Sequence, residues 1–205
     1  MTNLFIILKK ELKELFRDLV VTFGVSSTKR KVLEEVYTKY DAPSELNGNK
    51  VLDIDKTIDV ISYFAIFVPG LSKVKLMKMM WYADMLSYQR TGQSLTGLVY
   101  LHEKLGAMPH GHREILSLDE ICVKEEDLPN YNNPMIKILP KKEVANIQFT
   151  ELEKIVLDTI IAKFKNFTAT EISEYMHQET AYTETKTNQP ISLNLQAKLE
   201  YSSGR

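Results

Sequence analysis

The chain has 205 residues, and its 26 basic and 27 acidic side chains give a formal net charge of −1. This length allows one domain of ordinary size with a small extension, and 44% hydrophobic with 26% charged residues excludes a disordered or fibrous chain. Near neutrality excludes attraction of the whole surface to nucleic acid or anionic lipid, and the single cysteine, Cys122, excludes an intrachain disulfide and a thiolate zinc cluster.

The first predicted element is an amphipathic helix that ends at Gly24, because apolar residues recur at three- and four-residue steps up to Phe23. Lys9 and Lys10 interrupt this stretch, so it is too polar to span a membrane. The opening residues lack the basic region of a secretory signal. We therefore expect a cytoplasmic protein without a membrane partner.

A second helix is predicted after Ser26 or Ser27, either of which can cap it. The turn-forming stretch 41–49 follows and predicts a domain boundary near residue 48. The predicted division is an N-terminal helical hairpin over residues 1–48, a main domain over 49–199 and a tail over 200–205.

Two longer helices are expected next. The first runs from Asp53 to about residue 68 and stops at Pro69-Gly70, and the second is capped by Ser72 and runs from residue 73 to about 90. The second is apolar on most sides, which is typical of a helix packed by neighbours on several faces. Lys75, Lys78 and Asp84 are its polar exceptions.

The middle of the chain predicts a small β element. Residues 98–101 form a short β-like run, turns are expected around Gly106, Pro109 and Gly111, and residues 135–139 and 144–149 are predicted to pair as a hairpin. Two capping boxes, at 150–153 and 168–171, then open two further helices. The predicted fold class is mainly α (α+β) with a small antiparallel β element.

The sequence contains no catalytic motif of a recognised type. His110 and His112 have a spacing that could share a metal ion, but an exposed polar turn explains them better. Cys122 lies between apolar residues, which favours an inert thiol. We therefore expect no enzyme activity, no cofactor and no metal site.

The N-terminal helices also allow a DNA-binding interpretation. Residues 23–27 resemble the turn of a helix-turn-helix, and Lys29, Arg30 and Lys31 would then contact phosphates. Val20 occupies a position that normally needs a small residue, and Arg30 a position that normally needs an apolar one. The alternative is a helical hairpin that packs on the main domain or on a partner.

Five sequence blocks occur in a fixed order along the chain: 71–84 (LSKVKLMKMMWYAD), 91–97 (TGQSLTG) with Tyr100, 106–112 (GAMPHGH), 168–179 (TATEISEYMHQE) and 190–192 (PIS). Together they make residues from about 54 to 199 resemble the Panacea domain family, the SocA-like antitoxin domain that is also found in phage-associated proteins. The chain departs from the family pattern at four positions: Ala107 replaces the usual proline of the third block, Tyr182 stands where tryptophan is common, and Leu193 and Leu195 stand where aromatic residues are expected.

The resemblance implies a helical domain that acts by binding. Family members are antitoxins that neutralise very different toxins, including small alarmone-synthetase-like enzymes, and one type delivers its toxin to a protease. The implied function is neutralisation of a cognate protein toxin in a complex, with a DNA-binding autoregulator or a proteolytic adaptor as alternatives. The predicted toxin contacts are Lys75, Lys78, Tyr82, Asp84, Tyr88, Tyr100, Met108, Pro109 and His177.

Overall fold

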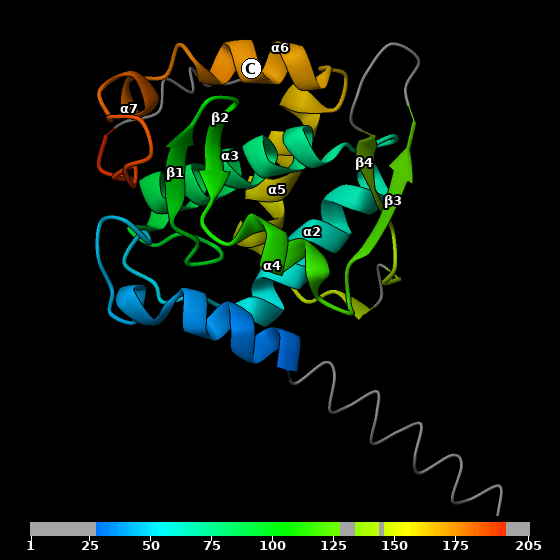
Figure 1. Cartoon of the computed structure of the whole chain (residues 1–205), viewed down its shortest axis with the longest axis horizontal. Coiled ribbons are helices and arrows are strands. Elements are labelled where there is room, and N and C mark those ends of the chain that lie inside the picture. Colours follow the sequence, from blue (N-terminus) through cyan, green and yellow to red (C-terminus); the bar gives the residue numbers. More distant parts are fainter. Residues whose placement is uncertain (1–27, 128–133, 144–145, 196–205) are drawn as a thin grey trace, which may run out of the picture.

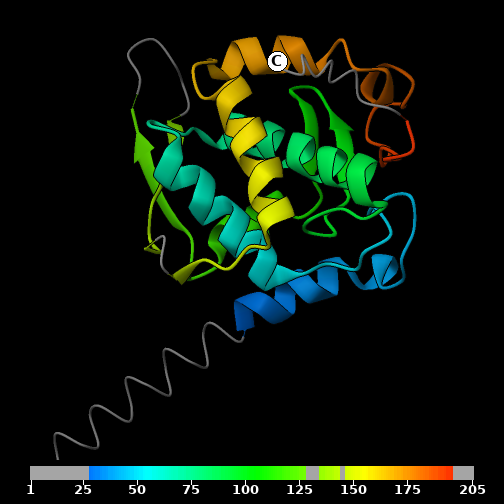
Figure 2. The ribbon, with the colours of Figure 1, turned by 180° about the vertical axis from the view of Figure 1, so that it is seen from behind.

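One helix occupies the centre of the fold, and the other elements pack around it. The computed structural model describes residues 28–127, 134–143 and 146–195. Helix α3 (Lys73–Thr91) lies between helix α5 (Glu151–Phe164) on one side and the hairpin of strands β1 (Tyr100–Glu103) and β2 (Gly106–Pro109) on the other (Figures 1 and 2). Every side chain from 75 to 87 is buried, which confirms the prediction of a central helix.

The limits of α3 and of the preceding helix α2 (Ile54–Phe67) follow from local capping. The Asp53 carboxylate accepts a hydrogen bond from the backbone N–H of Lys56 at 2.9 Å, and the Ser72 hydroxyl accepts one from Lys75 at 3.3 Å. Gly92 closes α3 in the left-handed conformation with φ 75°. None of the helices within the described residues is long and apolar enough to span a bilayer.

Capping boxes open the two later helices as predicted. The Thr150 and Glu153 side chains cap α5 reciprocally, and those of Thr168 and Glu171 cap α6 (Ala169–Met176). A short helix, α7 (Thr180–Thr183), follows α6 and was not predicted. Beyond it, the backbone N–H of Ile191 donates to the carbonyl of Tyr100 at 2.8 Å, so the sequence block 190–192 extends the small β element along β1.

The second hairpin pairs differently from the prediction. Strand β4 (Met135–Leu139) forms where expected, but its antiparallel partner is β3 (Cys122–Glu126), with Val123 opposite Ile138. Residues 146–149 are not a strand, and 144–145 lie outside the described residues. Strand β3 is difficult to predict from the sequence because it is an edge strand rich in charged residues. The same composition is typical of a solvated loop. On its other side β4 is tied to the α2–α3 connection, where the Ile138 N–H donates to the Leu71 carbonyl at 2.8 Å.

A short helix, α4 (His112–Ser117), forms where the sequence predicted only turns. Gly111 precedes it with φ 68°, and a Cβ at Gly111 would lie 3.0 Å from a methyl carbon of Val36. The absence of a side chain at Gly111 therefore allows the helical residues 28–36 to pack closely against it, and the Leu33 side chain of this segment is fully buried. Tyr37 follows, and its hydroxyl donates to the His110 carbonyl at 2.8 Å.

The N-terminal segment therefore packs on the main domain within the part that is described. A 3-10 turn, η1 (Thr38–Tyr40), leads from it into the connection to α2. The first predicted helix and the predicted turn at 23–27 lie outside the described residues. The division at residue 48 stays a prediction.

Substitution of Gly97 tests the close packing between the connection before α2 and the loop after α3. Its φ is 74°, and a Cβ would lie 2.3 Å from the carbonyl oxygen of Val51. Gly70 has a similar φ of 65° with nothing within 4 Å of a Cβ, so Gly70→Ala should cost only the left-handed penalty of about 1 kcal/mol. Gly97→Ala should cost several kcal/mol more in urea unfolding, because a backbone atom must move. Equal losses in the two variants would contradict this packing.

Candidate functional site

The predicted toxin contacts divide by burial. Tyr88 is half-buried and His177 is exposed. The other seven are buried. Five of these lie on α3 or at the start of β1, namely Lys75, Lys78, Tyr82, Asp84 and Tyr100, and the other two, Met108 and Pro109, lie on β2. These seven offer almost no surface to a partner, so their contact with a toxin stays a prediction, while their internal contacts can be described.

Asp84 is the centre of a buried hydrogen-bond network. Its carboxylate accepts from the Thr96 backbone N–H at 2.8 Å, from the Thr96 hydroxyl at 2.5 Å and from the Tyr100 hydroxyl at 2.7 Å. Burial raises the pKa of Asp84, and these hydrogen bonds oppose the rise. The Tyr100 ring also meets Trp81 edge-on, with centroids 5.1 Å apart. Asp84 thereby holds the loop after α3 and the start of β1 against the helix.

Lys78 connects α3 to β2. Its ammonium group is fully buried and donates to the carbonyl of Ala107 at 3.0 Å, with the sulfur of Met108 at 3.2 Å. Gly106 leaves room for this side chain, because a Cβ there would lie 2.9 Å from Lys78 Cε. Burial lowers the pKa of Lys78 to about 7, with partial opposition from Glu103.

Tyr82 and Lys75 connect α3 to the C-terminal helices. The Tyr82 hydroxyl donates to the buried carboxylate of Glu179 at 3.1 Å, and its ring stacks on Phe164 at 4.6 Å. Burial, followed by the Glu179 charge, raises the pKa of Tyr82. Lys75 donates to the Lys165 carbonyl at the end of α5 at 2.8 Å. The polar residues of the α3 motif therefore join this helix to the end of α5, to β2, to Glu179 and to the loop that leads into β1.

The predicted contacts that reach the surface lie near α7 and the C-terminal segment. Tyr88 is hydrogen-bonded to Asn194. The rings of His177 and His102 lie on Tyr182, with centroid distances of 5.0 and 3.8 Å. Tyr182 occupies the position where the family commonly has tryptophan, and its hydroxyl donates to the Glu103 carbonyl at 2.8 Å.

Two of the three predicted DNA contacts pair with carboxylates of the protein itself. Lys29 is bonded to Asp119, and Arg30 binds Glu120 through Nε at 3.1 Å and through a terminal nitrogen at 2.7 Å. The same terminal nitrogen lies 2.9 Å from Asp55. Lys31 is exposed. These ion pairs fasten the helical segment 28–36 to α2 and to the turn after α4, so Lys29 and Arg30 would have to leave them to reach a phosphate.

The two histidines that could share a metal ion, His110 and His112, have different surroundings. The His110 ring packs against Tyr37 and Tyr40, each at 5.7 Å, whereas His112 Nδ1 is 3.9 Å from Glu103. Burial lowers the pKa of both imidazoles. Across residues 28–127, 134–143 and 146–195, no three or more His, Cys, Asp or Glu side chains are grouped in a way that could hold a metal ion.

A groove of about 720 Å³ lies between two segments that sequence reasoning did not bring together. One wall comes from residues 30–41 and the other from residues 50–55, and the wall residues include acidic side chains and two tyrosines. The sequence predicts a domain boundary near residue 48, between these two segments, so no sequence signal places the walls face to face. We call this hollow the N-terminal groove.

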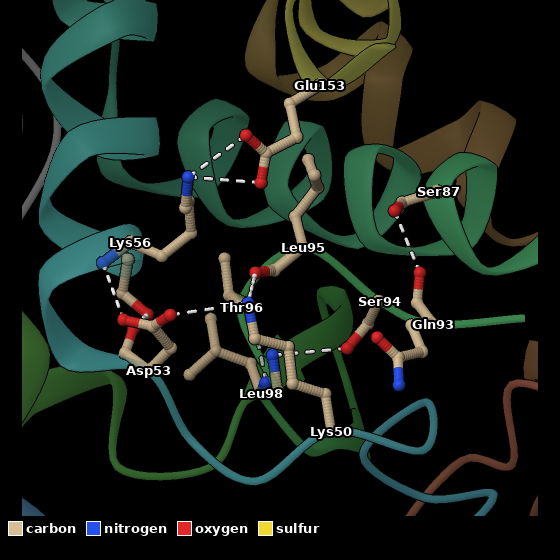
Figure 3. A network of polar contacts seen from close by, with 12 residues as sticks. Lys50, Asp53, Lys56, Ser87, Gln93, Ser94, Leu95, Thr96, Leu98 and Glu153 are labelled. Atoms are coloured by element: carbon tan, nitrogen blue, oxygen red, sulfur yellow. Dashed lines mark hydrogen bonds and ion pairs between the residues drawn. The ribbon is translucent and has the colours of Figure 1, made fainter. Parts of the chain in front are cut away.

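The wall at 50–55 is fastened to the loop after α3 (Figure 3). Lys50 donates to the Leu95 carbonyl at 2.5 Å, and the Asp53 backbone N–H donates to the Thr96 carbonyl at 2.8 Å. Lys56 forms an ion pair with Glu153 of α5 at 3.0 Å. Because Thr96 also binds Asp84, this wall of the N-terminal groove is connected to the buried network of α3.

Removal of the Asp84 carboxylate should be strongly destabilising. Asp84→Ala leaves the Thr96 N–H, the Thr96 hydroxyl and the Tyr100 hydroxyl without a buried acceptor, and at about 1–3 kcal/mol per unsatisfied group the loss should exceed about 3 kcal/mol. Tyr100→Phe removes one of these donors and should cost about 1 kcal/mol. Urea unfolding measures both, and a loss in Asp84→Ala no larger than in Tyr100→Phe would refute the network.

Lys78 should make stability rise with pH. Its pKa of about 7 in the folded protein is below the ordinary 10.5, so between these values the unfolded chain binds a proton that the folded chain does not. Stability therefore increases through this window, by up to about 1.4 kcal/mol per pH unit. Lys78→Met should remove that increase relative to the wild type, whereas Lys154→Met at an exposed position of α5 should retain it. Unfolding at pH 7 and at pH 9.5 gives the comparison, and an unchanged slope in Lys78→Met would contradict the assignment.

The chain was compared with models of known protein families, with curated proteins and with solved structures. The model of a family described as antitoxin SocA-like, Panacea domain, matches residues 76–182, which is more than half of the chain. No curated protein and no solved structure matches the chain. The matched region runs from α3 to α7 and contains the network residues Lys78, Tyr82, Asp84 and Tyr100. The resemblance seen in the sequence is thereby confirmed, and the chain belongs to the antitoxin SocA-like, Panacea domain family.

Proposed function

We propose that this protein is the antitoxin of a toxin–antitoxin pair and that it neutralises its cognate protein toxin by binding it directly, without catalysis. The observation that carries the proposal is its membership of the antitoxin SocA-like family. The partner is a protein toxin, and a small alarmone-synthetase-like enzyme is the type that the sequence resemblance suggests.

The construction of the domain supports a binding function. Lys75, Lys78, Tyr82 and Asp84 fasten the central helix to α5, β2, Glu179 and the loop after α3. A surface that is held in place before binding loses less conformational entropy when a partner docks. The buried motif residues therefore serve binding indirectly, as positioning residues for the elements around them.

Autoregulatory DNA binding through the N-terminal segment is less well supported. Lys29 and Arg30 pair with Asp119, Glu120 and Asp55, which leaves Lys31 as the predicted phosphate contact without such a pair in the described structure. A protein that neutralises several phosphates shows a steep salt dependence of binding. Promoter binding that is unchanged after alanine substitution of all three residues would reject this site.

Co-expression with an adjacent gene that is toxic when it is expressed alone tests the proposed function. We expect the wild-type protein to restore growth, to co-purify with the toxin and to leave the amount of toxin unchanged. Asp84→Ala, which should strongly destabilise the domain, is the loss-of-function control. Absence of both rescue and complex would overturn the proposal. Rescue accompanied by a protease-dependent fall in toxin abundance would instead identify a proteolytic adaptor, and direct neutralisation would be rejected.

A further inference from the structure

We infer that the N-terminal groove is the docking site for a segment of the toxin that combines cationic and apolar side chains. This inference rests on the proposed function and adds to it the binding surface and the chemistry of the partner. The groove lies outside residues 76–182, the region that the family model matches. It is therefore a place where this chain can differ from other family members in the partner it selects.

The charge of the groove favours a cationic partner. Its walls carry four carboxylates, those of Glu34, Asp41, Asp53 and Asp55, against the two cations Arg30 and Lys50, for a net charge of −2. Both cations are already engaged inside the protein.

Two of the carboxylates are left for a partner. Asp53 and Asp55 pair with Lys50 and Arg30, whereas the side chains of Glu34 and Asp41 are exposed and form no ion pair with any residue of the described ranges. Complementary charges across an interface accelerate association and select the partner. A lysine- or arginine-bearing segment would meet two uncompensated carboxylates, Glu34 within the wall at 30–41 and Asp41 at its end.

The groove also offers apolar surface between its carboxylates. Val51 is 43% exposed, and Leu52, Ile54 and Tyr40 are partly buried. The ammonium group of Lys39, which is not among the wall residues, lies 4.9 Å from the centre of the Tyr40 ring and occupies one face of it, so the apolar surface offered to a partner is mainly that of Val51 and Leu52. An amphipathic segment can place aliphatic groups on Val51 and Leu52 while its cations reach Glu34 and Asp41.

Both walls are fixed before a partner arrives. The wall at 30–41 is held by the Arg30 ion pairs and by the Tyr37 hydroxyl, and the wall at 50–55 by Lys50 and by the Asp53 backbone. The groove thus needs little rearrangement to receive a segment, which favours specific binding. Its negative charge opposes nucleic acid, so this face is suited to a protein partner.

A pair of charge reversals tests the groove. The groove variant is Glu34→Lys with Asp41→Lys, and the matched control is Glu125→Lys with Glu184→Lys, which changes net charge equally at exposed positions on β3 and just after α7. The probes are the product of the neighbouring toxic gene and two synthetic amphipathic peptides, one of leucine and lysine and one of leucine and glutamate. Thermal unfolding of each variant checks that the fold is retained.

The wild-type protein should bind the lysine peptide in preference to the glutamate peptide. The groove variant should lose about tenfold in affinity for the lysine peptide and for the toxin, and the control variant should keep both affinities. Rising salt should weaken wild-type binding more than binding by the groove variant.

The outcomes separate this inference from the proposed function. Wild-type rescue with equal toxin affinity in the groove variant would overturn the groove assignment and leave the antitoxin function standing. Failure of the wild type to bind the toxin would overturn the function. Equal binding of both peptides would overturn the groove chemistry independently of the toxin. A dimer in solution that Glu34→Lys with Asp41→Lys dissociates would assign the groove to a second copy and also overturn the inference.

Discussion

The desolvation of one helix constrains the rest of this structure. From residue 75 to residue 87, α3 is removed from water on all sides, and this interval contains two lysines and an aspartate. A buried charge or polar group without a partner is costly, so each of these side chains must find one within the protein. Asp84 accepts hydrogen bonds from Thr96 and Tyr100. Lys78 donates to the Ala107 carbonyl, and Lys75 donates to a carbonyl at the end of α5. The arrangement of the neighbours around α3 satisfies these demands.

This constraint separates the residues that identify the family from those we propose to meet a partner. The motif of α3 lies almost entirely inside, where it determines how the loop after the helix, β2 and the C-terminal helices are held. The N-terminal groove is built mainly from residues before the matched region, yet one of its walls is hydrogen-bonded to Thr96, which also binds Asp84. A firmly held interior beside a groove that lies outside the matched region suits the direct binding of a toxin that we propose.

Sequence reasoning about the site succeeded in recognising the family and was weaker in assigning contacts. Aromatic and charged residues on a helix suggest an interface when exposure is unknown, and only the packing of α5 and the β1–β2 hairpin reveals that Tyr82 and Lys78 are covered. In the same way, a run of three cations suggests phosphate contacts, because the carboxylates of Asp119 and Glu120 are about ninety residues away in the sequence. Pairing over that distance leaves no local pattern.

The fold class and the starts of the four longer helices α2, α3, α5 and α6 could be predicted from the order of residues, whereas α4 and α7 could not. Asp53, Ser72, Thr150 and Thr168 cap helices through hydrogen bonds to residues three positions away, and such short-range interactions are legible in the order of residues. Three arrangements become visible only in the folded chain: β4 pairs with β3, residues 28–36 pack at the start of α4, and two segments beside a predicted boundary enclose a groove. These arrangements depend on which surfaces are buried against each other. Such burial involves residues that are far apart in the sequence, so no local pattern predicts it.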